Sequence, residues 1–259
     1  MADSNLLYDG AIVWDEEVDI LVIGSGFAGL SAAIEAYLGG ASVVILEKMK
    51  AVGGNSIISD GGIAAPGTVV QELRSIHDSA DLMYKDMLNS GKGINHPELV
   101  RVVVEGAKDA FEWSKDFLGV EYLDRIDIFG GHSVPRCYTA KNISGSTIIK
   151  KMMAKVEELG MKVRLKTFFK RFVLDSKGRV CGAIVSDDYD YKNSKQGKDY
   201  FIHVKKAVIL ATGGFGSDVI FRMAQDPRLN ETMDSTNKPF PSADALKEAL
   251  KIGAAPIHL

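Results

Sequence analysis

The chain has 259 residues, of which 46% are hydrophobic and 25% are charged, a balance typical of a soluble globular protein. This composition excludes disordered and collagen-like proteins. The formal net charge of -3 is spread over 31 basic and 34 acidic residues, without a long block of either sign. The sequence therefore carries no electrostatic footprint for nucleic acid, and an anionic substrate would need local arginines.

Cysteine usage and the N-terminus indicate the compartment. Cys137 and Cys181 form neither a CxxC pair nor a haem-attachment motif, so we expect no disulfide framework. The acidic N-terminus lacks the basic and apolar regions of a signal peptide, and no segment has the long apolar stretch of a membrane span. These features favour a cytoplasmic protein, or a periplasmic one if an export signal has been removed.

The first predicted elements form a βαβ unit. Residues 18–23 (VDILVI) are apolar and rich in β-branched side chains, which indicates a buried parallel strand ending at Gly24. Residues 26–38 carry apolar residues and alanines at helical spacing, and residues 42–46 (SVVIL) predict a second strand that ends before Glu47. Strand, glycine turn, helix and strand within about thirty residues are the order of a right-handed crossover.

A GxGxxG motif occupies the turn of this unit. Gly24 makes the turn, Gly26 lets the backbone approach a pyrophosphate, and Gly29 lets the helix pack closely on the strand. The helix start supplies N–H donors for phosphates, and Glu47 can accept both hydroxyls of a ribose while disfavouring a 2′-phosphate. The motif does not separate FAD from NAD, and a glycine turn without a ligand is the alternative. The residues predicted to contact the dinucleotide are Gly24, Gly26, Ala28, Gly29, Glu47 and Lys48.

The remaining predicted elements follow in chain order. The tetrad from Asp175 to Gly178 lies between two β-rich runs and predicts the turn of a hairpin. The helix that starts near Pro97 has Asn95 and His96 before it as a cap. The expected bounds are a glycine-rich loop at 51–67, helices at 69–90 and 97–118, irregular polar chain at 130–145, a helix at 147–159, a strand at 161–165, the hairpin within 168–186, a strand at 201–211 and a helix at 242–251.

Residues 47–62 read EKMKAVGGNSIISDGG. This segment resembles the loop that passes along FAD in flavoproteins of the fumarate reductase and succinate dehydrogenase family. The resemblance implies FAD as the cofactor, lined by backbone amides and short polar side chains, whereas the alternative is that these residues only form a loop. The residues implied in FAD binding are Gly53, Gly54, Asn55, Ser56, Ser59, Gly61 and Gly62.

Asn55 bears on how FAD is held. In membrane-bound members of the family a histidine in this loop is bonded covalently to the flavin. The matching position here is Asn55, whose amide is not nucleophilic. The resemblance therefore implies non-covalent FAD, as in the soluble flavocytochrome-type fumarate reductases.

Residues 130–145 read GGHSVPRCYTAKNISG and resemble a second family stretch, with paired glycines, an arginine and a small-residue turn before a helix. His132 and Arg136 are its polar landmarks, and neither has an evident partner in the sequence. Soluble fumarate reductases have arginine, any residue and histidine here, whereas Tyr138 takes the histidine's place. That departure leaves a proton-handling role for the segment open, and His132 is more typical of a loop histidine than of a catalyst.

A third resemblance involves the end of the strand predicted at 201–211. An apolar strand that runs into Ala211, Thr212 and Gly213 is similar to a second cofactor contact of flavoproteins with two dinucleotide-binding folds. In the same family the strand near residues 167–169 passes the adenine, and Phe169 is the matching position. These four residues are therefore implied in FAD binding.

The last matching stretch is residues 236–259. Relatives have an aspartate flanked by glycines before a helix, and that aspartate approaches FAD. Asp244 matches it, but Ala243 and Ala245 replace the glycines. Capping of the helix by Ser242 or Asp244 is the equally weighted alternative.

The resemblance covers the chain from Asp19 onward and implies an α/β fold. The expected architecture is a Rossmann-like FAD-binding domain of the two-dinucleotide-binding type, truncated before the capping domain. Residues 1–17 would be an N-terminal extension, and residues 18–259 the N-terminal portion of the domain. The family's substrate-binding histidines and arginines fall in the missing portion, so no catalytic residue is assigned, and no metal site is expected.

The implied function is that of an FAD-dependent oxidoreductase acting on CH–CH groups. It would pass a hydride from reduced FAD to an α,β-unsaturated carboxylate such as fumarate, and this chain alone would lack the catalytic half. The implied partners are the carboxylate, an electron donor and a second chain that completes the fold. The alternatives are succinate oxidation, a steroid or aryl-acrylate substrate, and an FAD-binding subunit that only relays electrons; fold analogy does not choose among them.

Overall fold

The computed structural model describes residues 6–7, 12–194 and 196–259, which form two compact units. Unit 1 comprises Met1–Asn55 and Met153–Leu259, and unit 2 comprises Ser56–Met152. Within the predicted N-terminal extension, residues 1–5 and 8–11 lie outside the described residues. The domain boundary at residue 18 stays a prediction.

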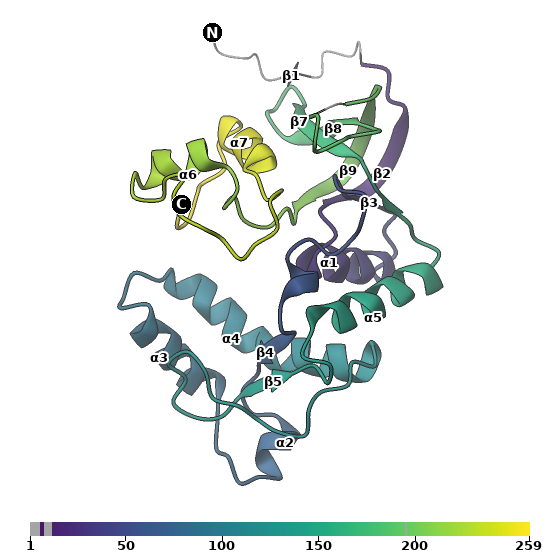
Figure 1. The fold of residues 1–259 in the computed structure, drawn as a ribbon. Coiled ribbons are helices and arrows are strands. Elements are labelled where there is room, and N and C mark those ends of the chain that lie inside the picture. The colour runs from purple at the N-terminus through teal and green to yellow at the C-terminus, as the bar shows by residue number, and fades with distance from the viewer. Residues whose placement is uncertain (1–5, 8–11, 195) are drawn as a thin grey trace. The chain divides into compact units, whose positions relative to one another are not determined.

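Unit 1 is built on a seven-stranded mixed sheet with the strand order β1-β7-β8-β9-β2-β3-β6 (Figure 1). β2 (Glu16–Ile23), α1 (Phe27–Leu38) and β3 (Val43–Leu46) form the predicted βαβ unit, with β2 and β3 parallel. β9 (Asp199–Leu210) pairs in parallel with the other side of β2, and β6 (Val163–Arg164) pairs in parallel with β3. The predicted strands are confirmed, and the carboxyl ends of these parallel strands share one edge of the sheet, where α/β folds bind ligands.

β7 (Phe168–Leu174) and β8 (Val180–Ser186) form the predicted hairpin, and β8 pairs antiparallel with β9. The carboxylate of Asp175 accepts hydrogen bonds from two backbone N–H groups of the turn, both at 2.9 Å, and Gly178 has a φ of 76°. Both features are typical of Asp and Gly in tight turns. β1 (Leu6–Leu7) pairs in parallel with β7.

Two helices near the C-terminus complete unit 1. α7 (Asp244–Lys251) confirms the predicted helix and packs on β7 through Ala245 and Ala249, which belong to the buried core formed with β2, β3, β7, β8 and β9. α6 (Val219–Gln225) is absent from the prediction, because seven residues are too few for helical periodicity to stand out. The carboxylate of Asp218 caps α6 by accepting a hydrogen bond from the N–H of Phe221 at 3.0 Å.

Unit 2 is mainly helical, with one two-stranded antiparallel sheet formed by β4 and β5. The predicted loops at 51–67 and 130–145 are therefore wrong in part, because each contributes one of these strands. Tyr138 of β5 stabilises the pair by stacking on Phe111, with ring centroids 4.2 Å apart. The bounds are a 3-10 turn Ser56–Ile58, β4 Gly62–Ala64, α2 Val69–Glu72, α3 Ala80–Ser90, α4 Pro97–Glu112, a π-helical turn Trp113–Phe117, β5 Cys137–Thr139 and α5 Gly145–Glu158, which continues into unit 1.

The single helix predicted at 69–90 is wrong, because the chain breaks between α2 and α3. Thr68 caps α2, and Ser75 then takes a left-handed φ of 55°, a conformation that an L-residue does not adopt inside a right-handed helix. Ser79 is the N-cap residue of α3, and its hydroxyl accepts a hydrogen bond from the N–H of Leu82 at 3.1 Å. Because of this break, Asp78 lies in the connection between α2 and α3 and not within a helix.

α4 begins at Pro97 as predicted but ends at Glu112, so the predicted helix 97–118 is too long as an α-helix. The hydroxyl of Ser114 donates to the carbonyl of Phe111 at 2.7 Å, which competes with the regular helical ladder. Within the described ranges, no helix combines the length and the apolar character needed to cross a membrane.

Candidate cofactor site

The glycine turn, Gly24–Gly29, is packed so tightly that two of its glycines have no room for a side chain. A Cβ on Gly24 would lie 2.3 Å from the carbonyl oxygen of Ala211, and one on Gly29 would lie 1.9 Å from the carbonyl oxygen of Gly24. Gly24 also has a φ of 110°, which favours glycine. The predicted packing role of Gly29 fits this contact, and the turn lies directly against the end of β9, where Ala211 was predicted to approach the same cofactor.

The start of α1 is open to a ligand. Gly26 is its N-cap residue and supplies no side-chain acceptor to the first turn, and Ala28 in that turn is exposed. An α-helix leaves its first N–H groups without internal partners and carries a partial positive charge there. The turn can therefore bind an anionic group such as a pyrophosphate.

Glu47 at the end of β3 links the glycine turn to the loop that follows. Its carboxylate accepts hydrogen bonds from the hydroxyl of Ser25 at 2.5 Å and from the N–H of Met49 at 2.9 Å. The Ser25 hydroxyl in turn accepts from the N–H of Gly53 at 3.1 Å. The N–H of Ser25 also donates to the carboxylate of Glu47, at 3.3 Å. Because a carboxylate has about four acceptor positions, the buried Glu47 retains capacity for about one further donor, such as a ribose hydroxyl.

Three further predicted residues leave space beside the backbone of unit 1. Gly54 and Gly213 have φ values of 47° and 74°, and a Cβ on either would have no protein atom within 4 Å. Thr212 is exposed beside Gly213. Neither glycine is required by side-chain packing, so this space can admit a ligand.

Asn55 and Lys48 both contact the segment before α7. The side-chain oxygen of Asn55 accepts a hydrogen bond from the N–H of Lys238 at 2.9 Å. The ammonium of Lys48 donates to the hydroxyl of Ser242 at 2.6 Å and lies 3.1 Å from the carboxylate of Asp244. Three predicted cofactor residues are therefore brought into one hydrogen-bonded region of unit 1.

Phe169 has a different environment. Its side chain is buried in the core of unit 1, with its ring centroid 4.8 Å from that of Phe172. A ring in this position packs the sheet, so any contact of Phe169 with adenine would involve its backbone. Its role in FAD binding stays a prediction.

Four predicted residues lie in unit 2. The hydroxyl of Ser59 donates to the carbonyl of Ser56 at 2.9 Å and accepts from the N–H of Gly61 at 3.3 Å. A Cβ on Gly61 would lie 3.0 Å from Ala140 and Ser144, and the N–H of Gly62 donates to the side chain of Asp60 at 3.1 Å. These contacts hold the loop in a defined conformation, and the predicted role of Ser56, Ser59, Gly61 and Gly62 toward FAD stays a prediction.

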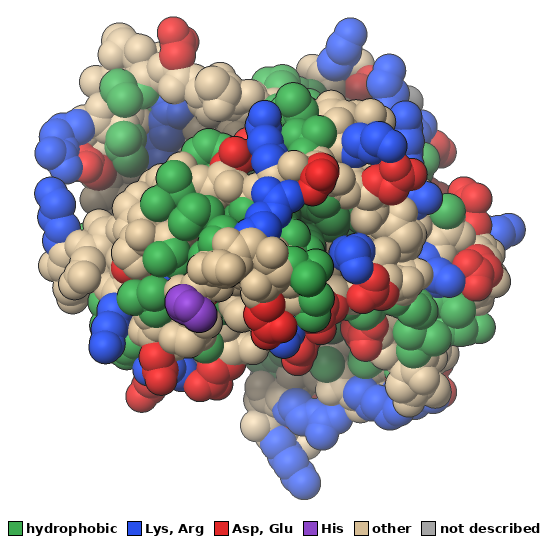
Figure 2. All heavy atoms as spheres, turned by 90° about the horizontal axis from the view of Figure 1, so that it is seen from below, with side chains coloured by type: hydrophobic (Ala, Val, Ile, Leu, Met, Phe, Trp, Pro, Cys, Tyr) green, Lys and Arg blue, Asp and Glu red, His purple; other side chains and the backbone are tan. Residues whose placement is uncertain are grey.

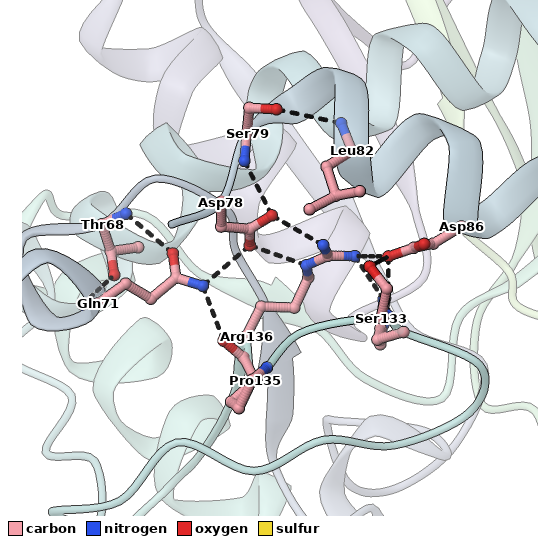
Figure 3. A network of polar contacts seen from close by, with 10 residues as sticks. Thr68, Gln71, Asp78, Ser79, Leu82, Asp86, Ser133, Pro135 and Arg136 are labelled. Atoms are coloured by element: carbon pink, nitrogen blue, oxygen red, sulfur yellow. Dashed lines mark hydrogen bonds and ion pairs between the residues drawn. The ribbon is translucent and has the colours of Figure 1, made fainter. Parts of the chain in front are cut away.

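Arg136 lies at the centre of a buried polar cluster in unit 2, shown in Figure 3. Its guanidinium binds the carboxylate of Asp78 through Nε at 2.8 Å and Nη2 at 2.7 Å, and that of Asp86 through Nη1 at 2.6 Å. Nη1 also donates to Nδ1 of His132 at 2.9 Å. The expectation that His132 and Arg136 lack partners is therefore wrong; the break between α2 and α3 delivers Asp78, and α3 delivers Asp86.

The pKa shifts agree with a structural ion cluster. Burial opposes the charge of Arg136, but hydrogen bonds to Asp78 and Asp86 outweigh it and raise the arginine's pKa. Burial likewise opposes the charge of Asp86, but bonds from Ser133 and Arg136 lower its pKa. Burial and the neighbouring guanidinium lower the pKa of His132. All three guanidinium nitrogens donate to carboxylates, so Arg136 is committed to holding the chain.

Tyr138, which replaces the family's histidine, is buried as well. Its hydroxyl is hydrogen-bonded to the hydroxyl of Thr68 at 2.5 Å. Burial raises the pKa of Tyr138 above its ordinary value, so the phenol is neutral at physiological pH. The residue contributes to packing and gives no sign of proton transfer.

Sequence reasoning missed the residues that connect these motifs. Ser25 is not among the predicted cofactor residues, although its hydroxyl joins Glu47 to Gly53. Asp78 was placed inside a predicted helix; the Asp-Ser pair at residues 78 and 79 is a helix-start signal that could have identified the break. Asp86 gave no signal beyond its place on a polar helix face.

The face drawn in Figure 2 carries no field of one sign. Figure 2 shows basic and acidic side chains interspersed over the face that it presents. Many form exposed pairs, such as Lys141 with Glu121 at 2.7 Å and Lys166 with Asp188 at 3.0 Å. Over the part of the chain that the structure describes, there is no group of three His, Cys, Asp or Glu side chains placed to hold a metal ion.

Comparison with known proteins gives consistent matches. A family model described as an FAD binding domain matches residues 19–258. The acrylate reductase flavoprotein subunit of Shewanella woodyi is 41% identical over 249 residues, covering 96% of this chain and 49% of that protein. The urocanate reductase of Eggerthella lenta is 39% identical over 239 residues, covering 92% of this chain and 38% of that protein. The chain thus spans about half the length of such relatives, or less.

A solved structure agrees with the fold. The open conformation of a flavocytochrome c3 fumarate reductase matches with a TM-score of 0.85 at 31% identity, over 93% of this chain and 41% of that chain. The predicted fold class is therefore confirmed, and FAD is confirmed over NAD as the dinucleotide of this domain.

Proposed function

This chain belongs to the FAD-binding domain family of fumarate reductase-type flavoproteins, and we propose that it is the FAD-binding part of an oxidoreductase that reduces an α,β-unsaturated carboxylate. The similar proteins named above act on acrylate, urocanate and fumarate, which all have a carbon–carbon double bond conjugated to a carboxylate. That shared chemistry supports the substrate class. It does not select one member of the class.

The observation that carries the proposal is the joined edge of unit 1. The glycine turn touches the end of β9 at Ala211, and Ser25 connects it to Glu47 and Gly53. This edge of unit 1 therefore brings together the start of α1, a carboxylate and open glycine backbone. This combination fits a dinucleotide: α1 would hold the pyrophosphate and Glu47 the adenosine ribose.

Bound FAD supplies hydride transfer from its reduced ring. The residues of this chain bind and orient it, and Asn55 supports a non-covalent attachment, since its amide is engaged with Lys238 and is not a nucleophile. We propose no catalytic acid within the described residues, because Arg136, the arginine of the family-like stretch 130–145, is bound to Asp78, Asp86 and His132. The catalytic acid that protonates the substrate would then come from elsewhere in the complete enzyme.

A second function is an FAD-binding subunit that relays electrons to a separate substrate-binding chain. The relative from Shewanella woodyi is named as a flavoprotein subunit, which favours this arrangement. The two functions differ in whether the substrate site belongs to the same polypeptide. They share the FAD site of unit 1.

The test has two stages. Purified protein should show a flavin absorbance spectrum, and acid precipitation should release all FAD into the supernatant; flavin retained in the pellet would contradict the non-covalent site. Anaerobic oxidation of reduced viologen is then measured with fumarate, acrylate and an aryl acrylate. The 259-residue chain should turn over none of them, whereas the chain extended through the family's cap and C-terminal segment should prefer one. Equal rates for the two chains would locate the catalytic acid within residues 1–259.

A further inference from the structure

Three side chains join the end of β3 to the start of α7. The ammonium of Lys48 lies 3.1 Å from the carboxylate of Asp244 and donates to the hydroxyl of Ser242 at 2.6 Å. The Ser242 hydroxyl donates to the same oxygen of Asp244. Each member of this triad, Lys48, Ser242 and Asp244, therefore contacts the other two, so moving one disturbs both of the others.

The triad does not serve as a helix cap. The N-cap residue of α7 is Ala243, and no side chain accepts a hydrogen bond from the first turn of this helix. Ser242 and Asp244 direct their polar atoms to Lys48, on a different element, 194 and 196 residues away in the sequence. The alternative interpretation of these two residues as caps is therefore wrong. The start of α7 is held by Lys48 in the loop after β3, and by Asp218, whose carboxylate accepts a hydrogen bond from the N–H of Ala243 at 3.4 Å.

The position of Lys48 connects the triad to the cofactor site. Lys48 directly follows Glu47, whose carboxylate binds Ser25 in the glycine turn. Asn55, later in the same loop, holds the N–H of Lys238. The loop after β3 therefore fixes both ends of the segment that runs into α7.

Charge balance gives the triad a second consequence. Glu47 in the loop after β3 and Asp244 at the start of α7 are both carboxylates, and the ammonium of Lys48 offsets the charge of Asp244. The side chains of Lys48 and Asp244 are 23% and 37% exposed, so water screens the pair only partly. Without Lys48 this region would be more negative, which disfavours the pyrophosphate of FAD.

We propose that Lys48 is a positioning residue for FAD: through Ser242 and Asp244 it fixes the start of α7 beside the cofactor site and balances the charge there. This inference rests on the proposed FAD site. It assigns Lys48 a role through its side-chain partners, in place of the direct FAD contact predicted from the sequence. The role predicts both a weaker affinity and a changed salt dependence when the ammonium is removed.

The experiment compares Lys48→Met with Lys247→Met in the full chain. Lys247 is on the same helix and forms a similar pair with Asp218, at 2.5 Å, but its partner belongs to α6's cap and not to the loop after β3. FAD affinity is measured by quenching of flavin fluorescence at low and high salt. We expect Lys48→Met to weaken binding roughly tenfold, less so at high salt, and Lys247→Met to change it less than twofold.

Three further variants test the mechanism. Lys48→Arg keeps the charge and should restore most of the affinity. Lys48→Met combined with Asp244→Asn should bind no more weakly than Lys48→Met alone, because both changes break the same pair. If Lys48→Met fails to fold, Ser242→Ala removes one contact of the triad while keeping both charges, and it should weaken binding by roughly threefold.

The outcomes separate this inference from the proposed function. A wild-type chain that binds no FAD would overturn both. If the wild type binds FAD and Lys48→Met binds it equally well, only the positioning role is overturned. Equal weakening in Lys48→Met and Lys247→Met would also overturn it, because general loosening of α7 would then explain the loss.

Discussion

Units 1 and 2 treat their polar groups in opposite ways. In unit 1 the N-cap residue of α1 is Gly26, which supplies no side-chain acceptor, and open space lies beside Gly54 and Gly213. In unit 2 every guanidinium nitrogen of Arg136 donates to a buried carboxylate. The N–H groups at a helix start favour an anionic ligand, whereas donors satisfied in the interior hold the chain in one arrangement. The stretch 130–145, whose Arg136 resembles a functional arginine of the family, thus has a structural role.

Arg136→Met should have the largest effect on stability. It leaves Asp78 and Asp86 buried without a cation, which costs about 3–5 kcal/mol at pH 7. Urea unfolding is followed by the fluorescence of Trp113 in a Trp14→Phe background, because each unit contains one of the two tryptophans. Lys141→Met, which breaks an exposed pair with Glu121, is the control and should cost less than about 1 kcal/mol.

The same variant has a pH signature. The folded pKa of Asp86 lies below its ordinary value of 3.8, so its contribution is present above that pH and is lost as pH falls through the lower folded pKa. In Arg136→Met the carboxylate of Asp86 loses the cation that lowers its pKa, so this pKa rises and protonation relieves part of the penalty. The difference in the free energy of unfolding between the variant and the wild type should therefore be smaller at pH 5 than at pH 7. A constant gap would show that the loss comes from packing alone.

Gly24→Ala probes the other region and should cost about 2–4 kcal/mol, from overpacking against Ala211 and from a left-handed φ. The measurement is urea unfolding of unit 1, followed by Trp14 in a Trp113→Phe background. Gly214→Ala is the matched control, because a Cβ there has no atom within 4 Å, and its stability should change by less than about 0.5 kcal/mol. Similar losses in both would contradict the packed turn.

Glu47→Ala should weaken FAD binding by roughly 1–3 kcal/mol, the range for losing hydrogen bonds to a charged group. Glu47→Gln should do less harm, because it keeps the shape and one acceptor oxygen. Binding is measured by titration with FAD after far-UV circular dichroism has established that each variant is folded. Unchanged affinity in both variants would exclude Glu47 as the ribose acceptor.

Gly106→Ala should have the smallest effect and the opposite sign. Gly106 lies within α4, has no protein atom within 4 Å of an added Cβ and shows no left-handed φ. Alanine should therefore stabilise unit 2 by about 0.5–1 kcal/mol. The midpoint of urea unfolding by Trp113 fluorescence reports the change, and a lower midpoint would show that this helix face is covered.

Local patterns predicted most of unit 1 because its elements follow from short-range chemistry. β-branched runs produce β2 and β3, and a turn tetrad at Asp175 produces the hairpin. Unit 2 was predicted less well, since the Arg136 cluster depends on partners distant in sequence. No pattern around residue 136 indicates that residues 58 and 50 positions earlier supply its carboxylates.

The candidate site divides in the same way. Gly24, Gly29 and Ala211 could be predicted because close backbone packing demands glycine or alanine, which leaves a readable pattern. Ser25 and Lys48 act through side-chain contacts whose partners are set by the folded sheet. Such contacts leave no periodic signal in one sequence.

The central position of β2 has a consequence for synthesis of the chain. Glu17 of β2 pairs with His203 of β9, which is 186 residues later. At roughly 5–20 residues per second, a ribosome needs about 10–40 s to deliver that partner, and until then one side of β2 has unpaired backbone groups. The acidic residues Glu17 and Asp19 make this exposed strand a poor template for aggregation, and Lys205 of β9 later meets both carboxylates, at 3.5 and 3.3 Å. Charges that protect the nascent strand thus become part of its final pairing.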